Sequence, residues 1–143
     1  MQSARNISGS EHMKLFAREW VSAVRPDTKG ATIIALEGDL GAGKTTFVQG
    51  VAQSLGVVEV TSPTFVIQKN YPITHTDFEQ LVHIDAYRLE NTHELLVLDF
   101  EAIANNPKNL VFIEWPERVP DITPSATLRF TWVSENERLV EEG

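Results

Sequence analysis

The sequence has no cysteine among its 143 residues, which excludes disulfide bonds and thiolate metal sites and is compatible with a reducing compartment. Its longest apolar runs fall well short of the roughly 18 residues that cross a bilayer, so we expect no membrane span. The first ten residues show no apolar segment typical of a secretory signal. Basic residues are few: 12 Lys and Arg against 20 Asp and Glu give a net charge of −8. Such a surface repels a phosphate backbone, so we expect no direct, non-specific nucleic-acid binding.

What is present is an ordinary globular composition, with 42% hydrophobic and 22% charged residues. We find no internal repeat, low-complexity tract or long linker. The length suffices for a hydrophobic core of its own. The sequence therefore predicts one domain covering residues 1–143.

The most informative stretch is Gly-Asp-Leu-Gly-Ala-Gly-Lys-Thr-Thr, residues 38–46, which matches the phosphate-loop pattern G-x-x-x-x-G-K-[ST]. Glycines allow close approach of the backbone, whose N–H groups then face phosphate oxygens. Lys44 can reach the β- and γ-phosphates, and the Thr45 hydroxyl can ligate Mg²⁺. An apolar strand over 31–37 and a helix over 45–55 are predicted on either side, so the helix N-terminus faces the phosphates. This stretch predicts a nucleotide site with a divalent cation.

The order of the other elements predicts a three-layer α/β fold, a mostly parallel sheet flanked by helices. A first helix is expected after Ser10 as its N-cap. The 64–85 segment is a candidate antiparallel hairpin, and strand 126–133 is a candidate edge strand. We expect a solvated acidic tail. The remaining predicted elements are a strand over 64–71, a strand over 81–85, a helix over 94–104 and a strand over 110–114; the acids of the tail are Glu135, Glu137, Glu141 and Glu142.

Two of the predicted strands end in an acid, Asp85 after 81–85 and Glu114 after 110–114. Ligands of open α/β sheets bind outside the carboxyl ends of the strands. ATP hydrolysis needs Mg²⁺ held by hard oxygen ligands and a group that orients the attacking water. The two carboxylates can divide these tasks, and the sequence alone does not decide which takes which.

His83 shares a face of its strand with Asp85, because side chains alternate along a strand. We expect it to orient Asp85 or its neighbours by hydrogen bonding. A zinc site with His75 or His93 is the alternative, and it is disfavoured because those histidines fall in predicted loops or helix starts.

Four motifs occur in order: Gly-Asp-Leu-Gly-Ala-Gly-Lys-Thr-Thr-Phe (38–47), Thr-Ser-Pro-Thr-Phe (61–65), His-Ile-Asp-Ala-Tyr-Arg-Leu (83–89) and Phe-Ile-Glu-Trp-Pro-Glu (112–117). Together they resemble the TsaE (formerly YjeE) family of small bacterial ATPases, over nearly the whole chain. The resemblance implies a P-loop NTPase fold, ATP and Mg²⁺ as ligands, and a cytoplasmic location. It also implies a role in making N6-threonylcarbamoyladenosine at position 37 of tRNA. The implied partner is the TsaD–TsaB heterodimer, with tRNA reached indirectly through that complex.

The same resemblance implies roles for individual residues. Thr45 and Asp85 would ligate Mg²⁺, directly or through water, and Glu114 would position water or serve as a further metal ligand. Ser62 and Thr64 would sense the γ-phosphate. The catalytic candidates are thus Glu114, Lys44 and Asp85; the nucleotide-binding candidates are Asp39, Leu40, Gly41, Ala42, Gly43, Lys44, Thr45, Thr46, Trp115, Ser62 and Thr64. Tyr87 and Arg88 would contact the partner or tune the site, although a surface ion pair explains Arg88 equally well.

Several functions fit a phosphate loop. An ATPase that is slow alone and works within a complex is favoured. A small-molecule kinase would need an arginine-rich lid or acceptor pocket, whereas basic residues here are few and scattered. A non-catalytic nucleotide-sensing subunit is a further alternative. A GTPase is disfavoured, because the sequence contains no guanine-reading N-K-x-D motif.

Overall fold

The computed structural model of the chain describes residues 3–39, 41–58, 68–96 and 99–143. Within these ranges seven strands form a single sheet in the order β1-β7-β6-β2-β5-β4-β3. The strands are β1 (Ser3–Ser8), β2 (Thr32–Glu37), β3 (Gln68–Pro72), β4 (Gln80–Asp85), β5 (Asn109–Glu114), β6 (Ala126–Ser134) and β7 (Glu137–Glu142). The helices are α1 (Gly9–Ala23), α2 (Lys44–Ser54), α3 (Thr92–Leu96), α4 (Phe100–Ala104) and the 3₁₀ turn η2 (Pro116–Arg118).

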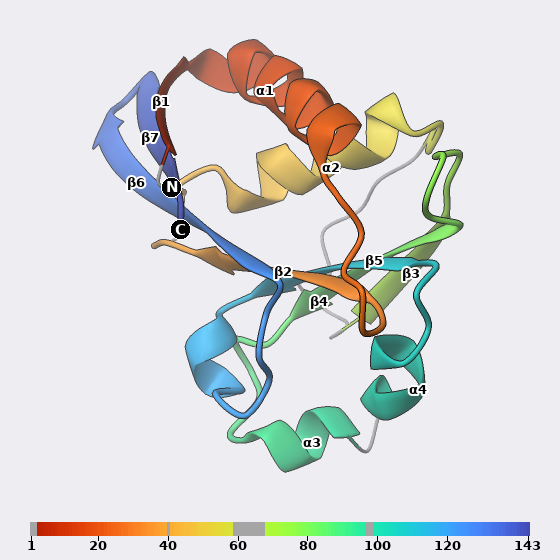
Figure 1. Cartoon of the computed structure of the whole chain (residues 1–143). Helices are drawn as coiled ribbons and strands as arrows, with labels where there is room; N and C mark the ends of the chain where they lie inside the picture. The colour runs from red at the N-terminus through yellow and green to blue at the C-terminus, as the bar shows by residue number, and fades with distance from the viewer. Residues whose placement is uncertain (1–2, 40, 59–67, 97–98) are drawn as a thin grey trace.

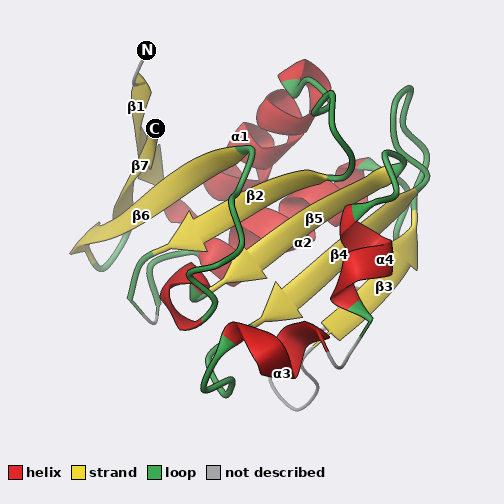
Figure 2. Cartoon of the chain, turned by 60° about the horizontal axis from the view of Figure 1, so that its bottom comes forward, coloured by secondary structure: helices red, strands yellow, loops and turns green. Residues whose placement is uncertain are grey.

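Helices cover both faces of this sheet, as Figures 1 and 2 show: α1 and α2 lie on one face, and α3 and α4 on the other. Each face has its own cluster of buried apolar side chains, one beneath α1 and α2 and one beneath the shorter helices. The predicted three-layer α/β fold is therefore confirmed. In the described ranges, none of the helices combines the length and apolar character that a bilayer crossing requires.

The middle of the sheet is parallel. β5 pairs in parallel with both β2 and β4, and β6 pairs in parallel with β2. Parallel strands bring their carboxyl ends to one edge, and the register places Glu114 beside both Asp85 and Leu36. The predicted convergence of the two acid-terminated strands is thus confirmed at the level of the backbone. This is the same sheet edge from which the phosphate loop leaves β2.

The margins of the sheet are antiparallel. β3 pairs antiparallel with β4, which confirms the predicted hairpin, although residues 64–67 of that prediction lie outside the described residues. At the other margin, β7 pairs antiparallel with β6 and with β1. β6 therefore lies inside the sheet, and its interpretation as a candidate edge strand was wrong.

The acidic tail is also not a solvated segment, because it forms β7. Val140 is only 2% exposed and packs in the core, while the acidic side chains of this strand are partly or fully exposed. Successive side chains of a strand point to opposite faces, so a strand can bury one face against the core and carry charged side chains on the other. The strand β1 was not predicted at all; its one buried residue among described side chains is Ile7, at 1% exposed.

Two helix predictions need correction. α1 begins at Gly9 and not after Ser10, with Ser8 in the N-cap position and no side-chain capping bond. The predicted helix over 94–104 is divided into α3 and α4, and residues 97–98 lie outside the described residues. Asp99, just before α4, has a φ of +64°, a left-handed conformation that a continuous helix does not allow.

Phe47 fixes the position of α2 on the sheet. Its ring lies 5.5 Å from that of Trp20 and 6.0 Å from that of Phe112, centroid to centroid. Gly50 lets α1 pack closely, since a Cβ there would lie 2.9 Å from the Cα of Lys14. The helix that carries the end of the phosphate loop is therefore held firmly by aromatic packing behind the site.

Candidate functional site

The loop between β2 and α2 has the backbone conformation that its glycines predict. Gly38, Gly41 and Gly43 all have positive φ, at 144°, 79° and 103°. A Cβ on Gly43 would lie 2.7 Å from Cε of Met13, and a Cβ on Gly38 would lie 2.5 Å from the carbonyl oxygen of Phe130. The positive φ favours glycine at all three positions, and at Gly38 the backbone of Phe130 also leaves no space for a Cβ. The helix begins at Lys44, so its N-terminus opens onto the loop.

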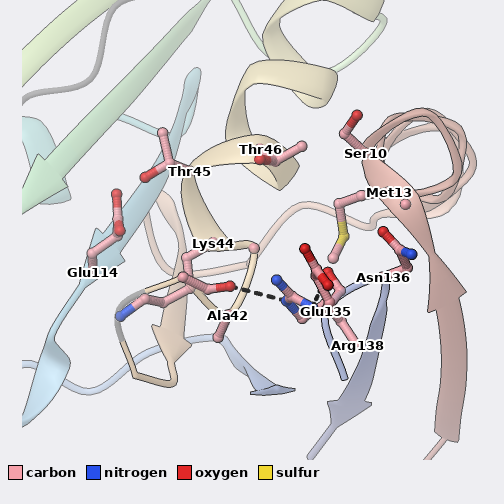
Figure 3. A pocket seen from close by; sticks show the side chains of 13 residues that line it. Ser10, Met13, Ala42, Lys44, Thr45, Thr46, Glu114, Glu135, Asn136 and Arg138 are labelled. Carbon is pink, nitrogen blue, oxygen red and sulfur yellow. Dashed lines mark hydrogen bonds between the residues drawn. The ribbon is translucent and has the colours of Figure 1, made fainter. Parts of the chain in front are cut away.

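A cavity of about 350 Å³ lies against this loop. That volume is at the lower end for small-molecule sites. Figure 3 shows the loop and Glu114 facing the hairpin between β6 and β7 across it, with the start of α1 alongside. The lining residues are Gly9, Ser10, Met13, Gly41, Ala42, Gly43, Lys44, Thr45, Thr46, Glu114, Glu135, Asn136 and Arg138.

Lys44, the first residue of α2, is buried, at 4% exposed. Its Nζ donates a hydrogen bond to the carbonyl oxygen of Gly38 and lies 4.0 Å from the ring centroid of Trp115. Burial lowers the pKa of Lys44, and the negative charge of Glu114 is the largest influence in the opposite direction. Desolvation disfavours the ammonium, so nearby carboxylates, and a bound phosphate, stabilise it.

Glu114 is also buried, at 5% exposed, and its Oε2 lies 2.5 Å from Nε2 of His83. The expected orienting contact of His83 is therefore made with the neighbour of Asp85 and not with Asp85 itself. The zinc alternative has no support: Nε2 of His75 lies 3.2 Å from the carbonyl oxygen of Val21, and His93 lies in α3. The described residues contain no cluster of three or more His, Cys, Asp or Glu side chains suited to a metal.

Asp85 is partly exposed, and its Oδ1 accepts a hydrogen bond from the backbone N–H of Tyr87 at 3.0 Å. The Tyr87 ring lies 5.1 Å from the ring of Trp115, which itself covers Lys44. Tyr87 and Arg88 are exposed on the surface beside the site. Aromatic side chains thus enclose the lysine from the side of β4 and β5.

The predicted site residues fall into three groups. Those of the loop from Gly41 to Thr46, together with Glu114, line the cavity. Asp85 and Trp115 lie next to these residues without lining the cavity, and Asp39 is exposed, with its carbonyl oxygen accepting the N–H of Ala42 at 3.1 Å. Leu40, Ser62 and Thr64 lie outside the described residues.

The hairpin wall of the cavity was missed by the sequence analysis. Nε of Arg138 donates to the carbonyl oxygen of Gly41 at 2.9 Å, and Nη1 donates to the carbonyl oxygen of Ser134 at 2.6 Å. One arginine therefore ties the hairpin to the phosphate loop. The carbonyl oxygen of Asn136 accepts the N–H of Gly9 at 2.8 Å, which joins the same hairpin to the start of α1. A signal was available, because Arg138 is the one basic residue within the acidic tail.

Comparison with known proteins agrees with this geometry. The family model described as "Threonylcarbamoyl adenosine biosynthesis protein TsaE" matches residues 7–140. The chain belongs to the TsaE family. Its phosphate loop, its two acid-terminated strands and the hairpin wall all fall inside the matched range.

Among solved structures, the TsaE-family chain is similar to YdiB from Bacillus subtilis, with a TM-score of 0.74 and 27% identity, over 99% of this chain and 84% of that one. It is 40% identical over 108 residues to the tRNA threonylcarbamoyladenosine biosynthesis protein TsaE of Synechocystis, covering 73% of this chain and 66% of the relative. The protein of the same name from Bacillus subtilis is 38% identical over 102 residues, which is 71% of this chain and 61% of the relative. The matches thus span less than two thirds of these curated relatives.

Proposed function

We propose that this chain binds ATP with Mg²⁺ and hydrolyses it as the ATPase subunit of tRNA N6-threonylcarbamoyladenosine (t6A37) formation, in complex with a TsaD–TsaB heterodimer. We propose further that residues 1–143 act as one domain, that turnover is slow without the partners, and that the reaction takes place in the cytoplasm, where tRNA is found. The names of the related proteins support the pathway, and Glu114 beside the phosphate loop, with Asp85 as its register partner, supports the chemistry.

One observation carries the proposal: a buried carboxylate and a phosphate loop line the same cavity. The loop N–H groups and Lys44 would hold the β- and γ-phosphates. Glu114 would accept a hydrogen bond from the attacking water and orient it toward the γ-phosphorus. Water and ATP then give ADP and inorganic phosphate.

The donor set fits Mg²⁺. The hydroxyl of Thr45 and the carboxylates of Asp85 and Glu114 are hard oxygen ligands at one edge of the sheet. Mg²⁺ in nucleotide sites is held by only one or two protein side chains, with phosphates and waters completing the octahedron. A dedicated cage of several carboxylates is therefore not needed. When bound, the ion would neutralise charge on the β- and γ-phosphates.

The two alternatives have less support. A small-molecule kinase would need basic groups around an acceptor, and the lining residues of the described cavity include only Lys44 and Arg138 as bases. Arg138 is already bonded to backbone carbonyl groups. A nucleotide-sensing subunit without catalysis would not need a carboxylate buried beside the phosphate loop.

The test is a reconstitution of the purified chain with TsaD and TsaB, with and without ATP. We expect the chain to be retained by the heterodimer in an ATP-dependent manner, and t6A formation to require it. The matched control is Glu114→Ala, which should bind the heterodimer and ATP and retain only a residual turnover. Unchanged turnover in that variant would support the nucleotide-sensing alternative. ATP-dependent phosphorylation of a small molecule by the pure chain would support the kinase.

A further inference from the structure

His83 is a buried polar side chain on the cavity side of the sheet that has no role in the proposed chemistry so far. It is 1% exposed, and its register partner on β5 is Phe112, which is 0% exposed. Leu81, two residues earlier on β4, shares its face and is also 0% exposed. The imidazole therefore lies in apolar surroundings, where a polar group is retained only with a hydrogen-bond partner.

The partner is Glu114. Nε2 of His83 lies 2.5 Å from Oε2 of Glu114, which is a short hydrogen bond. A carboxylate only accepts, so Nε2 carries the proton and donates. Among the described residues Nδ1 has no hydrogen-bond partner, so the bond to Glu114 is the polar contact that orients the ring.

Glu114 reaches the cavity and His83 does not. Glu114 is among the lining residues, whereas His83, which is 1% exposed, is not one of them. Glu114 is 5% exposed, so packing already restricts its side chain, and the bond at Oε2 fixes the orientation of the carboxylate. Oε1 is left to act on a ligand in the cavity. A group that orients water must be held in place before the reaction begins.

From this arrangement we propose that His83 is a positioning residue: it holds the carboxylate of Glu114 in the orientation in which Oε1 engages the attacking water. The inference rests on the proposed function, because it assigns His83 a part in the same ATP hydrolysis. His83 does not touch the nucleotide, so its loss should change kcat and leave ATP binding nearly intact.

The experiment compares His83→Leu with His83→Gln in the full chain assembled with TsaD and TsaB. Leucine fills the space without donating, whereas the glutamine amide keeps an N–H donor at similar reach. We expect His83→Leu to lower kcat about 10- to 100-fold, as expected for a misplaced catalytic group, with KM for ATP within about twofold of wild type. His83→Gln should recover most of that loss.

Leu81→Ala is the matched control for destabilisation, because it opens the same buried face without removing a hydrogen bond. It should lower the melting temperature and leave kcat within about twofold, measured well below that temperature. A double variant tests directly whether His83 acts through Glu114. In the Glu114→Ala background, His83→Leu should change kcat by less than about twofold, because the group through which it acts is absent.

Three results would overturn the inference while leaving the proposed function standing: wild-type kcat in His83→Leu, no recovery in His83→Gln, or losses that multiply in the double variant. Absence of turnover in the wild-type assembly would instead contradict the proposed function and this inference together. Intact ATP binding in each variant, followed by fluorescence titration, shows that the protein has folded.

Discussion

Asp85 and Glu114 end neighbouring parallel strands and are register partners, yet the structure gives them different surroundings. Glu114 is buried and bonded to an imidazole. Asp85 is partly exposed and bonded to a backbone N–H in the turn that follows β4. The difference shows that the position of an acid at the end of a strand does not by itself determine the function of its carboxylate. A fixed carboxylate suits the orientation of water, whereas an accessible one suits a metal ion that arrives with the nucleotide and exchanges its waters.

The largest effect should come from Glu114. Glu114→Gln keeps the shape and removes the negative charge, so the water loses its acceptor. We expect kcat to fall at least about 100-fold, with ATP binding retained. Steady-state ATP hydrolysis in the TsaD–TsaB assembly measures the first quantity and fluorescence titration the second. Loss of ATP binding in this variant would instead indicate that Glu114 is a ligand of Mg²⁺.

Lys44 is influenced by both acids. Glu114 opposes the lowering of the Lys44 pKa more than Asp85 does. Lys44→Met should weaken ATP binding roughly 10- to 100-fold, the loss of one charge-assisted contact. Nucleotide titration measures this. An equal affinity in the variant would mean that the loop amides alone hold the phosphates.

The same variant should be more stable than wild type at neutral pH. Because burial lowers the pKa of Lys44, the unfolded chain holds this proton more firmly than the folded one. The charge therefore costs stability below the lowered pKa, and the cost disappears as pH rises from there to the ordinary pKa of lysine. Melting curves should show Lys44→Met above wild type at pH 7, with the gap closing at alkaline pH. A gap that widens with pH would contradict the sign.

Asp85 provides the direct contrast with Glu114. Asp85→Asn should raise the Mg²⁺ concentration for half-maximal hydrolysis about tenfold or more, with a smaller loss at saturating Mg²⁺. Titration of activity with Mg²⁺ measures this. If Glu114→Gln shifted that titration and Asp85→Asn did not, the two roles assigned here would be exchanged.

The smallest effect should come from the opposite wall of the cavity. Arg138→Ala removes the bond from Nε to the carbonyl oxygen of Gly41, and we expect ATP affinity to fall about two- to tenfold without a change in Mg²⁺ dependence. Trp132→Ala is a suitable control, since its exposed ring lies 5.7 Å from the Arg138 guanidinium and outside the cavity. A larger loss of ATP affinity in Trp132→Ala than in Arg138→Ala would indicate that the effect comes from disturbing the hairpin and not from the bond to Gly41.

Local sequence patterns predicted the side of the cavity that the phosphate loop forms, because the strand, the glycines, the lysine and the helix follow one another within a short stretch. The acids at the strand ends were also predicted, since parallel strands share an edge. The proposed division of labour between them was not predicted, because the proposal rests on the bond between His83 and Glu114, which joins residues 31 positions apart. The proposed roles of Ser62 and Thr64 remain predictions.

β1 was not predicted for a related reason, and the hairpin wall was missed although Arg138 stands out as the one basic residue of the acidic tail. Among the described strands β1 pairs only with β7, so its partner lies far away in the sequence. Neither strand has the apolar alternation that marks a strand locally; each buries about one side chain, Ile7 or Val140. The split between α3 and α4 depends on the left-handed Asp99, which no helical pattern reveals.

The pairing of the first strand with the last has a consequence for how the protein is made. On the ribosome β1 emerges early, but it has no strand to pair with until Glu137–Glu142 follow. The start of α1 likewise receives its contact from Asn136 only then. The phosphate loop can close between β2 and α2 long before, so the cavity gains its opposite wall only when the hairpin of β6 and β7 has been synthesised. Nucleotide affinity would thus distinguish chains that already carry this hairpin from those that do not, and ATP would stabilise only the former.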